Sequence, residues 1–400
     1  MEHLKLKNVL KSVENIGLYI HIPFCKSKCG YCDFFRVTDL NLIDKYVDSL
    51  INELTILSIE NKKFRTIYIG GGTPSVLPID VFQKLLKTIN KLFLVEITKE
   101  FTVECNPEDV TETLIKLLYD NGVNRISMGV QSFDDNMLKF MNRRHNAQKV
   151  YQSIDIVQNI GISNISIDMI FGLPIIDEYS FDTDVEKFVN IGVEHLSAYS
   201  LSYEANSYFS CLLKNKKLHT PSDDDVAQQY ERLTQKLSEK GYLHYEISNY
   251  CKPKNNNTSL PICNFEQLNK NYFNSKHNTA CWQRAPYYGV GAGAYSFDGI
   301  RRWNNIANIE EYIQNSDIEN IREYEYLTSK DVYNETVMLG LRTLFGVNEN
   351  MIDEKYRDYF AQKAKQLFDE NKLYILPDNS FAIPESEWFL LDLITEKMML

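Results

Sequence analysis

Short runs rich in apolar and β-branched residues recur through the first half of the chain, with polar or helical stretches between them. These runs predict six strands, at Leu18–Ile22, Thr66–Ile69, Phe101–Val103, Asn124–Met128, Asn164–Ile170 and His195–Ser200. Between the strands, apolar residues repeat at helical spacing, as in 40–54 and 82–89. Strands that alternate with helices indicate parallel βα units, so we expect an α/β fold with a partial (β/α)6 barrel. A complete eight-unit barrel is the alternative, although no clear seventh and eighth strand–helix pair follows.

Distinctive polar segments stand where the predicted strands end. A group of cysteines follows the first strand, the run Gly70–Pro74 follows the second, and Glu104 follows the third. Gln131 follows the fourth strand, and Asp168 lies toward the end of the fifth. The carboxyl ends of parallel barrel strands form the rim at which chemistry is assembled. Five separate segments therefore point to one site at that rim.

The alternation of strands and helices weakens after about residue 202. The segments 242–250 and 288–297 are typical of strands of a smaller element, and the asparagine-rich stretch 252–276 is typical of a loop or insertion. Two helices, Ser329–Phe345 and Tyr356–Asn371, then precede a hairpin formed by 373–376 and 381–383. This order predicts a C-terminal winged-helix-like α+β domain with a structural role. We divide the chain into an N-terminal extension (1–16), the partial barrel (17–240), accessory strands with a polar insertion at 252–276 (241–325) and the C-terminal domain (326–400).

Composition restricts the classes of function. The 400 residues carry 43 lysines and arginines against 54 aspartates and glutamates, and the resulting net charge of −11 argues against a nucleic-acid binder. The longest apolar runs are broken well before the roughly 18 residues that a membrane span needs. The first 14 residues contain lysines without the apolar stretch of a secretory signal. We therefore expect a cytoplasmic protein without a nucleic-acid partner.

Three of the eight cysteines lie within eight positions, at Cys25, Cys29 and Cys32. Three thiolates in one loop can bind three irons of a [4Fe–4S] cluster and leave the fourth iron open. The alternative metal is zinc, which His21 or a distant cysteine could help to bind, but structural zinc sites usually take two separated pairs of ligands. The spacing directly after a strand favours the iron–sulfur cluster. S-adenosylmethionine (SAM) could ligate an open iron through its amino and carboxylate groups.

The string LYIHIPFCKSKCGYCDF at 18–34 resembles the start of radical SAM proteins. Further matches across 17–345 are the motifs GGGTPS at 70–75, ECNP at 104–107, GVQSF at 129–133, DMIFGLP at 168–174, YEISN at 245–249 and GAGAYS at 291–296. The chain is most similar to the group that contains oxygen-independent coproporphyrinogen III oxidase and a related heme chaperone. The resemblance implies a radical-SAM barrel that binds a [4Fe–4S] cluster and SAM.

Within this group, the sequence follows the chaperone pattern. The oxidase carries a fourth cysteine two positions after the third, where this chain has Phe34, and it has a longer N-terminal arm than the 24 residues that precede Cys25 here. The resemblance thus implies heme as cargo, acceptor hemoproteins such as respiratory cytochromes as partners, and membrane contact through those partners. The alternatives are a coproporphyrinogen III oxidase that acts through a 5′-deoxyadenosyl radical, and a zinc-bound regulator that uses the C-terminal domain.

The resemblance also implies roles for residues around SAM. Tyr19 would lie beside the sulfonium of SAM. Gly71, Gly72 and Thr73 would contact its amino group, because glycine permits a close approach of the backbone. Glu104 would accept a hydrogen bond from the cofactor. An ordinary strand-to-helix turn would explain the glycines equally well.

The same resemblance places Gln131, Arg143 and Asp168 at the carboxylate and the ribose hydroxyls of SAM. The forked guanidinium of arginine suits a carboxylate, whereas Arg143 taken alone is typical of a surface ion pair. Asp168 lies among apolar residues of a strand, where an unpaired carboxylate is costly, and this favours a functional role.

Contacts to heme are less well defined by the sequence. His21, His145 and His277 could each ligate iron, and Cys281 stands where the family commonly has tyrosine. A single histidine is more often structural than a ligand, so the sequence assigns no heme ligand. It also leaves the oligomeric state open.

Overall fold

Six parallel strands, paired in the order of the sequence, form the centre of the structure. The structure is a computed structural model that describes residues 16–176, 179–255, 262–315 and 317–400. Each strand pairs in parallel with the next along the chain; they are β1 (Gly17–Ile22), β2 (Thr66–Gly71), β3 (Glu100–Cys105), β4 (Arg125–Gln131), β5 (Asn164–Phe171) and β6 (His195–Ser200). All six predicted strands are confirmed. Nearly all of the predicted N-terminal extension, 1–16, lies outside the described residues.

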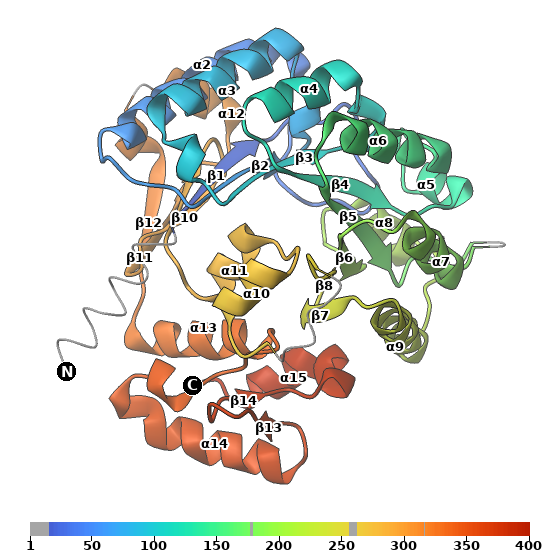
Figure 1. The fold of residues 1–400 in the computed structure, drawn as a ribbon, viewed down its shortest axis with the longest axis vertical. Coiled ribbons are helices and arrows are strands. Elements are labelled where there is room, and N and C mark those ends of the chain that lie inside the picture. The colour runs from blue at the N-terminus through green and yellow to red at the C-terminus, as the bar shows by residue number, and fades with distance from the viewer. Residues whose placement is uncertain (1–15, 177–178, 256–261, 316) are drawn as a thin grey trace.

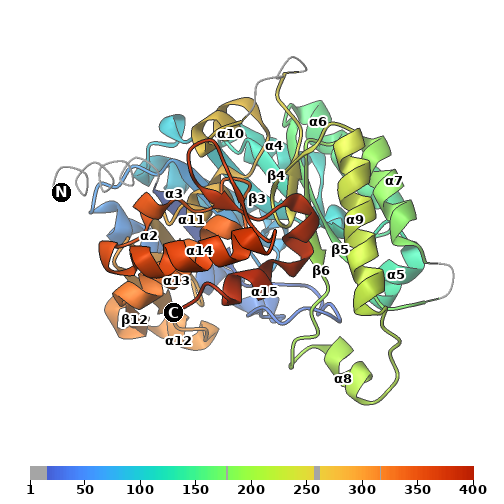
Figure 2. The same ribbon diagram turned by 90° about the horizontal axis from the view of Figure 1, so that it is seen from below.

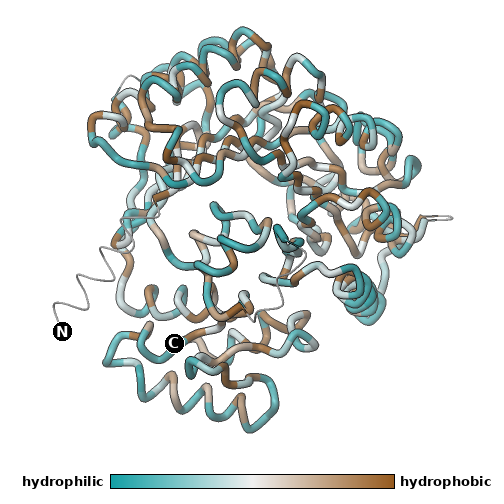
Figure 3. The backbone as a smooth tube through the Cα atoms, viewed as in Figure 1, coloured by the Kyte–Doolittle hydropathy of each residue, from teal (hydrophilic) through white to brown (hydrophobic). Residues whose placement is uncertain are grey.

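Helices cover the outer, convex face of this sheet (Figure 1). They are α2 (Ile43–Ser58), α3 (Ile79–Leu92), α4 (Glu112–Asp120), α5 (Asp135–Phe140), α6 (Ala147–Ile160), α7 (Phe181–Ile191) and α9 (Asp223–Glu239). Each buries one apolar stripe; in α3, Phe82, Leu86 and Ile89 are fully buried. Local signals set the helix ends: the Thr111 side chain caps the start of α4, and Gly161, with a φ of 113°, ends α6. Apolar residues lie mainly along the strands and the helix sides that face them (Figure 3).

Further strands extend the central sheet at both edges. On the β1 side lie β9 (Tyr287–Val290), β10 (Tyr295–Phe297), β11 (Arg301–Asn305) and β12 (Arg322–Tyr326), and on the β6 side lie β8 (Asn249–Cys251) and β7 (Leu243–Glu246). The complete order is β12-β11-β10-β9-β1-β2-β3-β4-β5-β6-β8-β7, so in the described part of the chain the sheet is an open, partial barrel. The strands predicted within 242–250 and 288–297 are confirmed, but they join the central sheet, so their assignment to a smaller element is wrong. Strands this short gain backbone hydrogen bonds by pairing with the free edges of β1 and β6.

Two short helices lie on the concave side of the sheet (Figure 1). These are α10 (Phe265–Asn271) and α11 (Lys276–Trp282). The sequence predicts a loop or insertion over 252–276, and a loop is wrong where α10 forms, while 256–261 lie outside the described residues. The buried Glu100 carboxylate accepts hydrogen bonds from the backbone N–H groups of Lys276 (2.8 Å) and His277 (3.0 Å) at the start of α11. A carboxylate at this position satisfies the free amides of a helix N-terminus. Glu100 therefore anchors α11 inside the curve of the sheet.

The C-terminal segment contains the predicted helices and hairpin. They are α13 (Ser329–Leu341), α14 (Arg357–Asp369), the hairpin of β13 (Tyr374–Ile375) and β14 (Phe381–Ala382), and a last helix, α15 (Leu391–Glu396). This segment meets the sheet edge through the Arg342 guanidinium, which lies 2.6 Å from the fully buried Glu246 carboxylate. No helix in the described ranges is long and apolar enough to cross a bilayer.

The two faces of the central strands differ in polarity. Leu18, Ile67, Phe101, Ile126 and Ile165 lie in the apolar core. On the same strands, alternate positions face the concave side and are mostly polar. The concave set includes Tyr19, His21, Tyr68, Thr102, Glu104, Arg125, Ser127, Asp168 and Ser197. The sheet thus presents a polar inner surface behind an apolar outer one.

A buried carboxylate joins α2 to the added strands. Glu53 of α2 is 1% exposed and accepts hydrogen bonds from the Gly291 N–H (2.8 Å), the Asn305 side chain (2.8 Å) and the Tyr312 hydroxyl (2.7 Å). The Arg322 guanidinium lies 3.5 Å away. Glu53→Ala should lower the free energy of unfolding by about 3 kcal/mol or more, because it leaves several buried donors and a cation without their partner.

Asp48→Ala, on the same helix, is the matched control for urea unfolding of the two variants. The Asp48 side chain is 62% exposed and pairs with Lys84 at the surface, so its loss should cost at most about 1 kcal/mol. Equal losses in the two variants would contradict the anchoring role of Glu53.

Candidate functional site

The three clustered cysteines lie in the loop between β1 and α2, and each sulfur contacts a different polar side chain. The Cys25 Sγ lies 3.4 Å from the Thr73 hydroxyl. An Nη of Arg143 donates to the Cys29 Sγ over 3.4 Å, and an Nη of Arg36 donates to the Cys32 Sγ over 3.1 Å. Donors of this kind stabilise thiolates, which are the form of cysteine that binds metals. Two arginines therefore stand where they can offset the charge of thiolates at Cys29 and Cys32, while burial raises the pKa of Cys25.

Packing fixes the middle of the cysteine loop. The Gly30 N–H donates to the Met141 carbonyl oxygen, and the Gly30 carbonyl oxygen accepts from the Phe209 N–H (2.9 Å). A Cβ at position 30 would lie 2.6 Å from the ring of Phe209, which is fully buried. Phe209 belongs to α8 (Tyr208–Lys214), which stands out from the body of the structure (Figure 2). The α8 helix therefore closes one side of the cysteine loop.

The chemistry of the cysteine loop fits an iron–sulfur cluster. Three half-buried thiols on one loop match the three protein ligands of a cluster with one open iron. In the described ranges, no three or more histidine, cysteine, aspartate or glutamate side chains are arranged to hold a metal ion. The fit therefore rests on the donor set, its position at the rim and the cationic groups around it.

The glycine-rich turn after β2 brings the predicted SAM contacts together. Gly71 has a φ of 118°, and its N–H donates to one Glu104 carboxylate oxygen over 3.0 Å. The Tyr68 hydroxyl donates to the other oxygen over 2.7 Å. At Gly72, a Cβ would lie 2.8 Å from the carbonyl oxygen of Phe24. The turn thus requires glycine at both positions.

Arg143 joins the cysteine loop to the ends of β3 and β4. Besides Cys29, its guanidinium donates to the Gly129 carbonyl oxygen (2.6 Å) and to the Asn106 side-chain oxygen (2.7 Å). The Asn106 amide donates in turn to the Thr73 hydroxyl over 3.3 Å. Gln131 lies beside this network at an irregularity of β4 and has a φ of 71°. Arg143 has no carboxylate partner in the described residues, so it is not the surface ion pair that its sequence position alone suggests.

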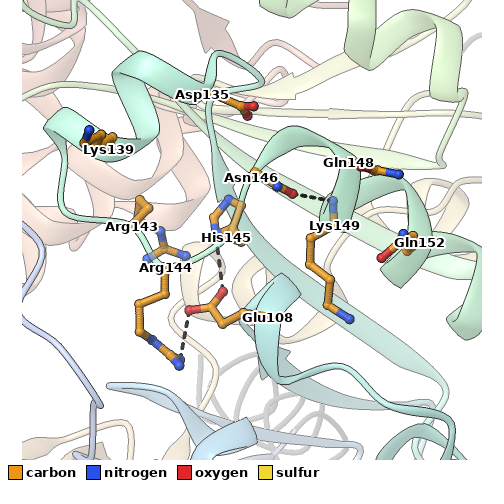
Figure 4. Close-up of a pocket in the computed structure, with 10 residues that line it drawn as sticks. All are labelled: Glu108, Asp135, Lys139, Arg143, Arg144, His145, Asn146, Gln148, Lys149 and Gln152. Atoms are coloured by element: carbon orange, nitrogen blue, oxygen red, sulfur yellow. Dashed lines mark hydrogen bonds and ion pairs between the residues drawn. The ribbon is translucent and has the colours of Figure 1, made fainter.

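A pocket of about 570 Å³ lies beside Arg143 (Figure 4). Arg144 pairs with Glu108 at 2.8 Å, and the His145 ring lies 3.2 Å from the other Glu108 oxygen. The second ring nitrogen of His145 lies 3.1 Å from the Val130 carbonyl oxygen. The hydrogen bond with His145 and the nearby arginines lower the pKa of Glu108 to about 2 despite burial. His145 is thus held within the wall of the pocket.

Asp168 lies inside the concave face, below the rim. Its carboxylate accepts a hydrogen bond from the Ser127 hydroxyl over 3.5 Å. Burial, and then the nearby Glu104 carboxylate, raise the pKa of Asp168 to about 7, while Arg125 opposes the shift. Burial also raises the pKa of Glu104. Two carboxylates that repel each other here favour a ligand that donates hydrogen bonds.

Tyr19 and two of the candidate heme ligands, His21 on β1 and His277 on α11, lie on the concave side of the sheet. The Tyr19 hydroxyl lies 3.3 Å from the His21 Nδ1, and burial lowers the pKa of His21 to about 4. The His277 Nδ1 lies 2.9 Å from the Thr66 hydroxyl, and burial lowers its pKa to about 4 as well. Both rings are therefore neutral at pH 7, which is the form that ligates metals. His145 lies apart from them, in the pocket wall.

An open parallel sheet with three thiols at its rim defines a radical SAM protein. The family model of the Radical SAM superfamily matches residues 19–188. The heme chaperone HemW of Lactococcus lactis is 36% identical and covers 94% of this chain and 97% of its own. HemW of Bacillus subtilis is 34% identical, with 84% and 86% covered, and HemW of Escherichia coli is 32% identical, with 70% and 69% covered. The chain belongs to the HemW heme chaperone family of the radical SAM superfamily.

A solved structure supports the fold. Coproporphyrinogen III oxidase (HemN) of Escherichia coli, a radical SAM enzyme, superposes with a TM-score of 0.79 over 98% of this chain and 93% of its own, at 21% identity. At this identity the likeness shows a shared fold. The fold predicted from the spacing of strands and helices is therefore confirmed.

Several residues of the site are missed by motif reading. They are Arg36 and Phe209 at the cysteine loop, Tyr68 at the rim and Arg125 on the inner face; Asn106 stands in the ECNP motif, in which only Glu104 was given a role. The strands themselves carried a signal, because parallel strands buried on both faces are usually continuously apolar. Polar residues at every second position, as in Arg125–Gln131, indicate instead an inner surface that meets a polar ligand.

Asp168→Asn should make the protein more stable above pH 7. The folded-state pKa of about 7 exceeds the ordinary 3.8, so between these values the folded chain keeps a proton that the unfolded chain has lost. The free energy of unfolding of the wild type therefore falls by an amount on the order of a few kcal/mol as the pH rises from 4 to 7. The Asp168→Asn variant has no carboxyl group at this position, so its free energy of unfolding does not fall for this reason. Urea unfolding at pH 5 and pH 8 measures the difference. An advantage of the variant that is equal at the two pH values would contradict the buried, protonated carboxyl group.

Proposed function

We propose that this protein is a heme chaperone that binds a [4Fe–4S] cluster and SAM and delivers heme to hemoproteins such as respiratory cytochromes. The observation that carries the proposal is the cysteine loop, in which three half-buried thiols lie at the rim of the sheet and two of them accept hydrogen bonds from arginines. The relatives that cover most of this chain are heme chaperones by name, which supports heme as the cargo.

In this proposal Cys25, Cys29 and Cys32 hold three irons of the cluster. Arg143 and Arg36 offset the negative charge of Cys29 and Cys32, and the Thr73 hydroxyl lies 3.4 Å from the Cys25 Sγ. Hydrogen bonds to cluster sulfurs of this kind raise the reduction potential of an iron–sulfur centre. When bound, the cluster supplies an open iron that accepts the amino and carboxylate groups of SAM.

Other rim residues position SAM in this proposal. Gly71, Gly72 and Thr73 offer backbone and hydroxyl groups to its amino end, and Tyr19 lies near the sulfonium. Acceptors suit the remaining hydroxyls, and Glu104, Gln131 and Asp168 provide them. Glu104 is already oriented by Tyr68 and by the Gly71 N–H, so little reorganisation is needed on binding. Arg143 acts through the Asn106 amide and the cysteine loop.

The position of Phe34 favours a chaperone over an oxidase. The Phe34 side chain is 76% exposed beside the cysteine loop, at the place where the oxidase carries a fourth cysteine. An apolar side chain cannot take the role of a thiol there. The fold shared with HemN is compatible with both activities.

An anaerobic comparison with a genuine oxidase tests this proposal. The reconstituted protein receives SAM, a reductant and coproporphyrinogen III, and a second sample is titrated with heme and followed by absorbance. We expect stable heme binding, transfer to an apocytochrome, and no protoporphyrinogen IX while the control oxidase is active. Formation of protoporphyrinogen IX, or a wild-type protein that does not bind heme, would overturn the chaperone function.

Cys29→Ser should abolish or strongly weaken binding of the cluster, because only two thiolates would remain on the loop. The measurement is the iron content and the brown absorbance at roughly 400 nm after anaerobic reconstitution. Cys211→Ser is the control, since Cys211 is an exposed thiol on α8 outside the loop and its loss should leave both values unchanged. Full retention of iron in Cys29→Ser would refute the ligand assignment.

A further inference from the structure

Arg125 is a buried cation on the concave face that has no hydrogen-bond or ion-pair partner among the residues that the structure describes. It is the first residue of β4 and is only 2% exposed. Within the described ranges no hydrogen bond or ion pair satisfies its guanidinium, and its Nε is fully buried without a partner. Burial of a guanidinium in this state is costly unless an anion or another acceptor compensates it.

The direction of the Arg125 side chain follows from the register of the sheet. Arg125 is paired with Thr102 of β3, which is paired with Tyr68 of β2. The ring of Tyr68 lies 5.2 Å from that of His277 on α11, which lies on the concave side. Paired residues of parallel strands point to the same face, so Arg125 points to the concave side with Thr102 and Tyr68.

The neighbours of Arg125 in the same layer also have polar atoms without partners. In register with Arg125 are Thr102 on one side and Asn164 on the other. The Thr102 Oγ1 and the Asn164 Oδ1 are buried and make no hydrogen bond within the described residues. Natural structures satisfy most of their buried polar atoms. Three adjacent strands that each carry one such atom at the same level mark a place prepared for a polar ligand.

The charges around Arg125 indicate what the ligand is. Arg125 acts on the pKa of Glu104 and of Asp168, yet neither carboxylate is within ion-pair distance of its guanidinium. A carboxylate beside the guanidinium and the Thr102 hydroxyl would receive hydrogen bonds from both groups, whereas the unpaired Asn164 Oδ1 is itself an acceptor and would take a donor instead. A cationic ligand would be repelled by the positive charge of Arg125. The site therefore selects a carboxylate.

We propose that Arg125, together with Thr102, binds a propionate carboxylate of heme inside the partial barrel. This inference rests on the proposed function, because it takes heme as the cargo. The carboxylate of SAM is the other source of the same chemistry. However, that group has to reach the open iron beside the cysteine loop, which follows the end of β1, whereas Arg125 lies at the beginning of β4.

The test compares heme with heme dimethyl ester, in which both propionates are esterified, on the full-length reconstituted protein. The wild type should bind heme at least tenfold more tightly than the ester. Arg125→Gln should lose at least tenfold in heme affinity, keep the affinity of the wild type for the ester, and bind SAM as before. Arg232→Gln is the control, because it removes an equal charge from an exposed arginine paired with Asp182.

Each contrary result overturns the proposal. One is a wild type that binds heme and its ester equally, which needs no variant and so holds even if Arg125→Gln misfolds. The others are unchanged heme affinity in a folded Arg125→Gln, and loss of SAM affinity instead, which would assign the site to the SAM carboxylate. If the wild type binds neither heme nor the ester, the proposed function itself fails, and this outcome is distinct from the other three.

Discussion

Burial of charged side chains on the concave face of the sheet is the constraint on which the rest of the structure depends. Glu100, Glu104, Arg125 and Asp168 lie there, largely removed from water, and each needs compensation. Glu100 is compensated by the first amides of α11, and Glu104 by the Tyr68 hydroxyl and the Gly71 amide. The charge of Asp168 is compensated only in part, which is consistent with its raised pKa. The Glu100 carboxylate, which holds α11 in place, therefore has hydrogen-bond partners for its charge. The charges of Asp168 and Arg125, where we place ligands, are less well compensated.

The same logic explains the surroundings of the cysteine loop. Two arginines beside the three thiols are placed to offset the negative charge of thiolates bound to iron. Arg143 is central, because one guanidinium contacts Cys29, the Gly129 carbonyl and Asn106, and Asn106 leads on to Thr73. The cysteine loop, the glycine-rich turn and the ends of β3 and β4 thus form one connected unit. The apolar contact of Phe209 with Gly30 adds α8 to that unit.

The elements that the sequence predicted correctly have strong local signals. The six central strands are apolar runs bounded by turns, and the helices between them carry a clear apolar stripe. Two predictions failed where the signal was weak. The strands β9 and β8 are four and three residues long, and only their pairing with β1 and β6 shows that they belong to the main sheet. The stretch 252–276 is rich in asparagine, yet α10 forms in it because Leu268 and Tyr272 are buried there by residues distant in sequence.

The sequence by itself determined the chemistry that the protein offers: three thiols at one spacing, a glycine-rich turn after a strand, and acidic and amide side chains at successive strand ends. These are local features, because the spacing of ligands in one loop and the period of two along a strand are set by covalent geometry. Only the tertiary structure decided which groups meet. The pairing of Arg143 with Cys29, the anchoring of α11 by Glu100 and the unpaired state of Arg125 each depend on residues that are far apart in the chain. Contacts of this kind follow from the packing of the sheet against its helices, which no local pattern in the sequence encodes.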